Sequence, residues 1–173
     1  MVSVSGSLLK YFLLTSLLLL ITHCATKPAP ALPSDILGIR IGMDKSDAQK
    51  QLEAIADFER DERKRQQVWK VRNDPRFSQL AVGYDENNQI RYVTAFVEPA
   101  TAKERIKFSD VGDLSKAKAE IVQPHYRYIW EIPSEGGRRP FVVNVYGDNP
   151  EFVTTYSLAG KVPSAEEKKA GNN

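Results

Sequence analysis

Apolar and polar residues alternate along much of the chain, and a period of two predicts strands that bury one face. Branched and aromatic residues, which strands favour, fill the alternating segments. Turn-forming residues separate them, as in Asp85–Asn88 and Gly147–Pro150. Leu37–Met43 also alternates and predicts a strand or an extended lead-in. The other predicted strands are Gln67–Val71, Leu80–Tyr84, Ile90–Val97, Tyr126–Ile132, Phe141–Tyr146 and Phe152–Leu158.

Two further segments have the spacing of a helix with one apolar stripe. The first predicts a helix over Lys45–Ala56, with Asp44 as its N-cap and Asp47 at the third helical position. The second predicts a helix over Asp113–Ile121. Between the first helix and the first strand, the densely charged Asp57–Arg65 predicts a solvated helix end or an exposed strand, with a basic binding site as the alternative. The two stripes are Ala48, Leu52 and Ile55, and Leu114, Ala117 and Ile121.

The order of elements returns in the second half of the chain. Trp69 matches Trp130 and Tyr84 matches Tyr146, and the strands as a whole match at offsets of 60 to 62 residues. A unit of one helix and three strands buries its apolar faces better beside a second copy. We therefore predict an α+β fold of two tandem helix-plus-three-strand antiparallel units that share one continuous sheet. A chance match of generic α+β patterning is the alternative.

The most apolar stretch of the chain is Leu13–Cys24, near the N-terminus. Its uncharged core has the length of a signal-peptide core and is shorter than a membrane-spanning helix. Ile21–Cys24 resembles a bacterial lipobox, which implies cleavage before Cys24 and acylation of its thiol. His23 departs from that motif, because a small residue normally precedes the cysteine. Cleavage near Ala29–Ala31 and an uncleaved anchor are the alternatives.

The segment after this cysteine predicts a tether. Thr26–Ser34 holds three prolines and no apolar face, which favours a stiff, extended spacer. Acyl chains on Cys24 would then hold the folded part at a membrane. The predicted organisation is a signal peptide (1–23), a lipid-anchored Pro-rich tether (24–35), two α+β units (36–98 and 99–160) and a disordered tail (161–173).

The composition of the chain excludes several kinds of partner and site. The formal net charge of +2 gives no argument for nucleic acid as a partner. Cys24 is the single cysteine, so an internal disulfide is excluded. Once His23 leaves with the leader, His125 is the single histidine and cannot alone build a zinc site or a catalytic triad. We expect no metal and no cofactor. The Gly136–Arg139 loop lacks the spacing of a phosphate-binding loop and predicts a hairpin turn.

One stretch resembles a known family. The residues that carry the resemblance are Ile39–Ala48, Leu52, Trp69 and the hairpin Leu80–Tyr92. They resemble the SmpA/OmlA (BamE-like) small outer-membrane lipoproteins and the repeat unit of the β-lactamase-inhibitor-protein fold. Both share an aliphatic-x-x-Gly-Met lead-in, a capped helix, a Trp-bearing strand and an apolar hairpin. The resemblance implies a fold and an envelope setting, and it names no specific partner.

Aromatic residues on the predicted strands give the candidate binding site. Large aromatic rings pack sheets together, and they also anchor protein interfaces, so both interpretations apply to the two tryptophans. Five strand tyrosines exceed what a small core needs and favour an interface. His125 is expected at the surface. The candidate partner-binding residues are Trp69, Tyr84, Tyr92, Tyr126, Tyr128, Trp130 and Tyr146.

These patterns together predict a non-catalytic envelope lipoprotein. Cys24 would anchor it in the outer membrane, facing the periplasm, and its sheet would bind another envelope protein. A secreted inhibitor or binder of an enzyme, acting through a tyrosine-rich sheet face, is the second hypothesis. An enzyme acting through carboxylates is the third, although the carboxylate pairs lie in charged or turn segments with no apolar pocket implied.

Overall fold

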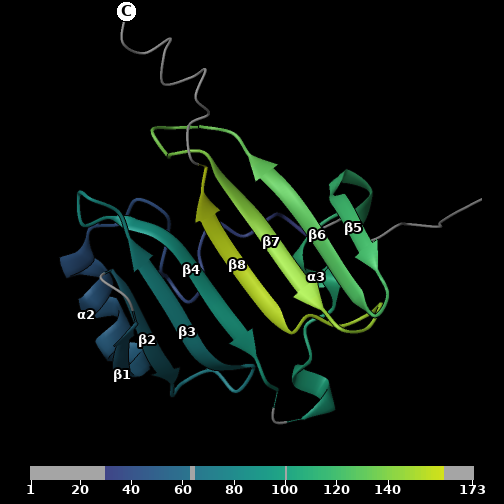
Figure 1. Cartoon of the computed structure of the whole chain (residues 1–173), viewed down its shortest axis with the longest axis horizontal. Coiled ribbons are helices and arrows are strands. Elements are labelled where there is room, and N and C mark those ends of the chain that lie inside the picture. Colours follow the sequence, from purple (N-terminus) through teal and green to yellow (C-terminus); the bar gives the residue numbers. More distant parts are fainter. Residues whose placement is uncertain (1–29, 63–64, 100, 162–173) are drawn as a thin grey trace, which may run out of the picture.

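A computed structural model describes residues 30–62, 65–99 and 101–161, so the signal segment, Cys24, the first half of the tether and the tail after Lys161 lie outside the described residues. The described part forms one eight-stranded sheet in the order β1-β2-β3-β4-β8-β7-β6-β5, with every pair antiparallel (Figure 1). The strands are β1 (Ala56–Glu62), β2 (Gln66–Val71), β3 (Phe77–Tyr84), β4 (Ile90–Val97), β5 (Lys118–Val122), β6 (His125–Ile132), β7 (Phe141–Gly147) and β8 (Thr155–Gly160).

Two meanders of four strands build this sheet. β1 to β4 pair in chain order, β5 to β8 do the same, and the two sets join where β4 pairs with β8. Thr94 lies opposite Ser157 at the middle of that junction. The predicted single continuous sheet is confirmed, but the fold is richer in strand than expected and each half contributes four strands instead of three.

The first predicted helix is confirmed as α2 (Lys45–Ile55), which buries Ala48 and Leu52. Asp44 is the N-cap residue, as predicted, but its side chain makes no cap hydrogen bond and accepts one from Gln89 Nε2 at 3.1 Å instead. The backbone carbonyl of Asp44 accepts from the N–H groups of Asp47 and Ala48. The side chain is therefore engaged with the β3–β4 hairpin.

The second predicted helix is wrong. In its place lie a 3-10 turn at Leu114–Lys116 and the strand β5, and a short helix α3 (Phe108–Val111) precedes them. Asp113 Oδ1 accepts from Ser115 N at 3.0 Å and from Ser115 Oγ at 2.7 Å, which favours a local turn over a continuing helix. β5 then gains its backbone hydrogen bonds from β6, so tertiary pairing overrides the helical spacing.

Two other boundaries differ from the prediction. Leu37–Met43 is no strand, because Leu37 and Gly38 both have positive φ (52° and 84°) and close a turn between Ile36 and Ile39. Positive φ interrupts the extended backbone that a strand needs. The last strand begins at Thr155, and Phe152 makes only an isolated bridge. The charged segment after α2 forms β1, so the exposed-strand interpretation was correct for that part.

The core lies on one side of the sheet. The lead-in (residues 30–44), α2 and α3 lie behind the strands in Figure 1, and their side chains meet those of both meanders in one cluster. Burying such a cluster supplies the main favourable term for folding. We call this side the covered face. Its members from outside the strands are Ile36, Ile39, Ala48, Leu52, Phe108, Val111 and Val153.

The two edges of the sheet differ in character. β1 is mostly charged and has a register shift between Phe58 and Arg60. β5 leaves Ile121 51% exposed and Val122 74% exposed. Charges and bulges disfavour the addition of another strand, whereas an apolar edge does not. The free edge of β1 is therefore better protected than that of β5.

We expect Leu52→Ala to lower the free energy of unfolding by about 2–5 kcal/mol, because Leu52 is fully buried between α2 and the sheet. Lys50→Ala is the matched control on the same helix, where the side chain is 79% exposed, and should change stability by less than about 0.5 kcal/mol. Denaturant unfolding followed by tryptophan fluorescence measures both. Equal losses would contradict the placement of α2 against the core.

Candidate protein-binding face

The seven aromatic candidates divide between the two faces of the sheet. Trp69, Tyr84 and Trp130 belong to the core at 3–5% exposure. Tyr126 and Tyr128 pack against that core and lie half-buried on the same side. The other two, Tyr92 and Tyr146, point to the opposite face, as their registers with β8 place them. The single tyrosine-rich surface expected from the sequence is therefore wrong.

A one-residue error in the predicted repeat explains part of this division. The sequence matched Tyr84 to Tyr146, but the registers put Leu80 opposite Trp69 and Val143 opposite Trp130. Leu80 and Val143 are thus equivalent, and Tyr146 falls one residue out of step with Tyr84. A shift of one residue moves a side chain to the other face of a strand.

The second face, which we call the open face, has no described helix or loop over it in Figure 1. At its centre Thr94 Oγ1 and Ser157 Oγ lie 2.9 Å apart across the β4–β8 junction. Small residues surround that pair, including Ala81 on β3 and Ala159 on β8. Val68 and Ala81 are buried although neither belongs to the core cluster. Other side chains of the open face therefore cover them.

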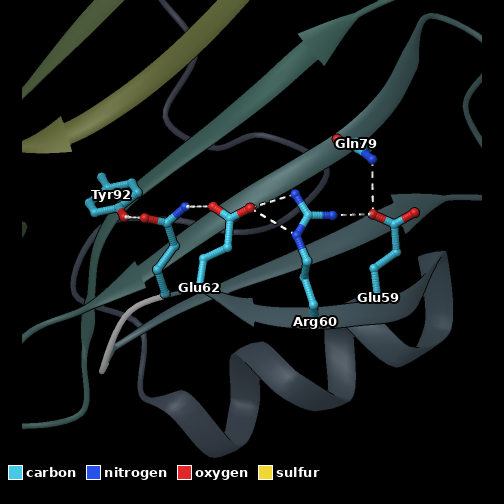
Figure 2. A network of polar contacts seen from close by, with 6 residues as sticks. Glu59, Arg60, Glu62, Gln79 and Tyr92 are labelled. Atoms are coloured by element: carbon cyan, nitrogen blue, oxygen red, sulfur yellow. Dashed lines mark hydrogen bonds and ion pairs between the residues drawn. The ribbon is translucent and has the colours of Figure 1, made fainter.

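A polar network crosses the first half of the open face (Figure 2). Gln79 donates to Glu59 at 2.9 Å, and Arg60 pairs with both Glu59 and Glu62. Gln66 donates to Glu62 at 2.9 Å and accepts from the Tyr92 hydroxyl at 2.7 Å. The network joins all four strands of the first meander.

Tyr92 lies flat against the sheet because its neighbour has no side chain. A Cβ placed on Gly83, directly opposite on β3, would overlap the Tyr92 ring. A glycine at such a site permits close contact between an aromatic ring and the backbone. The ring thus spans β3, and its hydroxyl reaches Gln66 on β2.

A second polar set lies on the other half of the open face. Arg127 donates to Asn144 at 2.8 Å and to Glu120 at 3.0 Å, and Lys118 pairs with the same carboxylate at 2.8 Å. The two cations hold the pKa of Glu120 below its ordinary value, with the Lys118 hydrogen bond as the largest cause. These contacts link β5, β6 and β7.

His125 lies at the end of this second set. Its Nδ1 contacts the Tyr146 hydroxyl and lies 3.3 Å from Asp148 Oδ1, and its ring stacks on the Tyr146 ring. Desolvation, followed by the hydrogen bond and charge of Asp148, raises the pKa of Tyr146. The predicted surface position of His125 is confirmed, since its side chain is 55% exposed.

The open face has exposed ion pairs around a flat centre of small residues, and both features can contact another molecule. Its charged groups are solvated, and such pairs add about 0–1 kcal/mol to stability. Among the described residues no group of three or more His, Cys, Asp or Glu side chains could hold a metal ion. No helix in the described ranges is long and apolar enough to span a membrane.

The sequence pattern did not predict that the charged residues of β1 belong to the open face. Glu59, Arg60 and Glu62 did not alternate with apolar residues, and the register shift after Phe58 disturbs the period of two. The one available signal was their density of charge, which is equally typical of a helix end. The Gly136–Arg139 loop is the predicted turn, between β6 and β7, with an isolated bridge from Glu135 to Arg138.

Comparison of the chain with protein-family models, with curated proteins and with solved structures finds no match. The resemblance to the small envelope lipoproteins therefore stays a prediction that depends on the residues quoted for it.

We expect Gly83→Ala to destabilise the fold by about 1–3 kcal/mol, because the new methyl group displaces the Tyr92 ring. In a Tyr92→Ala background the same change should cost much less, since the ring is gone. A double-mutant cycle measured by denaturant unfolding gives the coupling. Additive losses would contradict the contact between this ring and the β3 backbone.

Proposed function

We propose that the protein is an exported envelope lipoprotein, held at a membrane by acyl chains on Cys24, that binds another envelope protein through the open face of its sheet. The open face carries the binding half of this proposal. It spans eight strands, and no described element covers it. The anchoring half depends on Leu13–Cys24 and the Pro-rich spacer after it.

The proposed partner is a folded protein with a flat surface of mixed charge. The open face has few apolar rings, of which Phe96 is the most exposed at 41%. Its ion pairs lie on both sides of a centre of small and hydroxyl-bearing residues, around Thr94 and Ser157. Such a surface suits a polar interface, in which complementary charges give specificity.

A non-catalytic role is part of the proposal. The carboxylates of the open face are solvated and paired with cations, as at Glu62 and Glu120. General acid catalysis by a carboxyl group needs a raised pKa, and the one resolved shift in this group, at Glu120, is downward. The second hypothesis, a secreted enzyme binder, drew on a tyrosine-rich face, and the burial of Tyr84 in the core removes that support.

We also propose an internal repeat and a family relationship. We propose that the two four-stranded meanders are two copies of one unit, of the kind that the SmpA/OmlA resemblance implies. Trp69 on β2 and Trp130 on β6 support this, because they occupy equivalent core positions opposite the third strand of each meander. The missing second long helix is the main difference between the copies.

Cys24→Ala is expected to abolish membrane fractionation and labelling by radioactive palmitate in a Gram-negative host, because it removes the acylated thiol. His23→Ala is the matched control, which brings the motif closer to a lipobox and should keep both properties. Mass spectrometry of the wild-type chain should show an acylated N-terminal Cys24. An unlabelled chain beginning near Ala31 would contradict the anchor.

The binding half has its own test. A photo-crosslinking residue at Lys70 on β2 or Glu131 on β6 should give the same discrete adduct in intact cells, because both positions lie on the open face. The same residue at Lys50, on the outer side of α2, is the control and should not. Mass spectrometry identifies the adduct. Adducts from Lys50 alone would place the interface on the covered side and contradict the proposal.

A further inference from the structure

The turn between β5 and β6 exposes apolar side chains at one corner of the sheet, on the right of Figure 1. Val122 lies opposite His125, so Gln123 and Pro124 form a two-residue turn between them. Val122 is 74% exposed and Ile121 is 51% exposed, the highest values among the large hydrophobic side chains of the described residues. Contiguous exposed apolar side chains mark contacts with other proteins or with membranes.

The two exposed side chains point to opposite sides of the strand, as successive residues of a strand do. Ile121 lies opposite Tyr126, which packs against the core. Val122 lies opposite His125, whose ring stacks on Tyr146 of the open face. A flat partner on the open face would therefore cover Val122 and leave Ile121 in water. A bilayer surrounds whatever enters it and covers both sides of the turn at once.

The charged groups around the turn are already paired with one another. Glu120 pairs with Lys118 and Arg127 on the open face. His125 lies 3.3 Å from Asp148. The two carboxylates balance the charges of the lysine and the arginine, so this corner has no excess charge that would select an anionic lipid or an acidic partner. The apolar tip is therefore the feature that another phase can bind.

The N-terminal lead-in is held beneath the same part of the sheet. Leu32 packs against the core, and a Cβ placed on Gly112 would come within 2.5 Å of Leu32 Cδ2 and 3.2 Å of the Trp130 ring. Trp130 lies on β6, the neighbour of the edge strand β5. The chain that leads back to Cys24 therefore leaves the folded part on this side of the sheet.

The reach of the tether favours this corner over the opposite edge. Cys24 precedes Leu32 by eight residues, which span at most about 29 Å when fully extended. The turn lies five residues along β6 from Trp130, about 17 Å. β1 lies six strands from β6, about 29 Å across the sheet. The tether thus has slack when the β5–β6 turn contacts a membrane, whereas contact through β1 would need it fully stretched.

We propose that the β5–β6 turn inserts into the lipid bilayer, with Ile121, Val122 and Pro124 among the headgroups and the upper acyl chains. The inference rests on the proposed anchor at Cys24 and adds a second membrane contact. Acyl chains alone would leave the folded part free to rotate about the tether. Insertion of the turn sets its orientation, holds the β1 edge away from the membrane and leaves the open face free to bind its partner.

The test places an environment-sensitive NBD fluorophore on the turn of the full acylated chain in phosphatidylcholine vesicles. Acylation blocks Cys24, so Val122→Cys supplies the one thiol that takes the label. Phe58→Cys is the matched control, because Phe58 is a 49% exposed apolar residue on β1. We expect nitroxides on the lipid chains to quench the label at Val122 about threefold more than the label at Phe58, and aqueous iodide to show the reverse order.

A second variant tests whether the apolar side chains drive insertion. Ile121→Ser in the labelled Val122→Cys chain should lower quenching by the lipid nitroxides and raise quenching by iodide. Gln123→Ser is the control in the same turn and should change neither. Both positions are exposed, so we expect each substitution to change stability by less than about 0.5 kcal/mol.

Four results would overturn the proposal: equal lipid quenching of the two labels, equal access of iodide to both, no effect of Ile121→Ser, or a Val122 label shielded from both quenchers. The last result would assign the turn to a contact with protein. Mass spectrometry of each sample separates these results from failure of the anchor. An unacylated Cys24 would overturn the proposed function and this inference with it.

Discussion

The pairing of β4 with β8 is the contact on which the rest of the structure depends. These strands lie far apart in the chain, so their pairing closes a long loop, at an entropic cost that local hairpins avoid. Once made, it brings Ala95 and Tyr156 together at the centre of the covered face. Each meander alone would leave half of that core in water, so the sheet, the core and the open face depend on one long-range pair.

The position of a strand in the sheet decides how well the sequence predicts it. Ile90–Val97 was predicted to the residue, because a half-buried strand in the middle of a sheet alternates in burial and therefore in polarity. Of the edge strands, β5 was missed, and β1 was predicted only as one of two interpretations of its charged segment. β1 has charged residues on both faces, and β5 contains only Ile121 of the apolar stripe that predicted a helix. An edge strand is extended because the neighbouring strand pairs with it. The residues that make β1 and β5 extended therefore lie partly in their partners, β2 and β6.

The candidate face was harder to predict than the fold. Aromatic residues are conspicuous in a sequence, and five of the seven turned out to face the core side, as Trp69 does. The features that make up the open face are small residues, such as Gly83, and charges paired across strands, such as Glu59 with Gln79. Neither feature can be recognised from the order of residues along the chain, because the role of each residue depends on its neighbour on the adjacent strand.

The unequal edges of the sheet limit how copies of this chain can associate. An assembly that grows by adding strands needs a receptive edge at both ends of every subunit. Here the charged, bulged β1 closes one end, and β5, with Val122 74% exposed, is the less protected edge. Edge-to-edge contact between copies would therefore be limited to β5 against β5, an isologous pairing that uses up both receptive edges. Such an association ends at a dimer and cannot continue into a fibre.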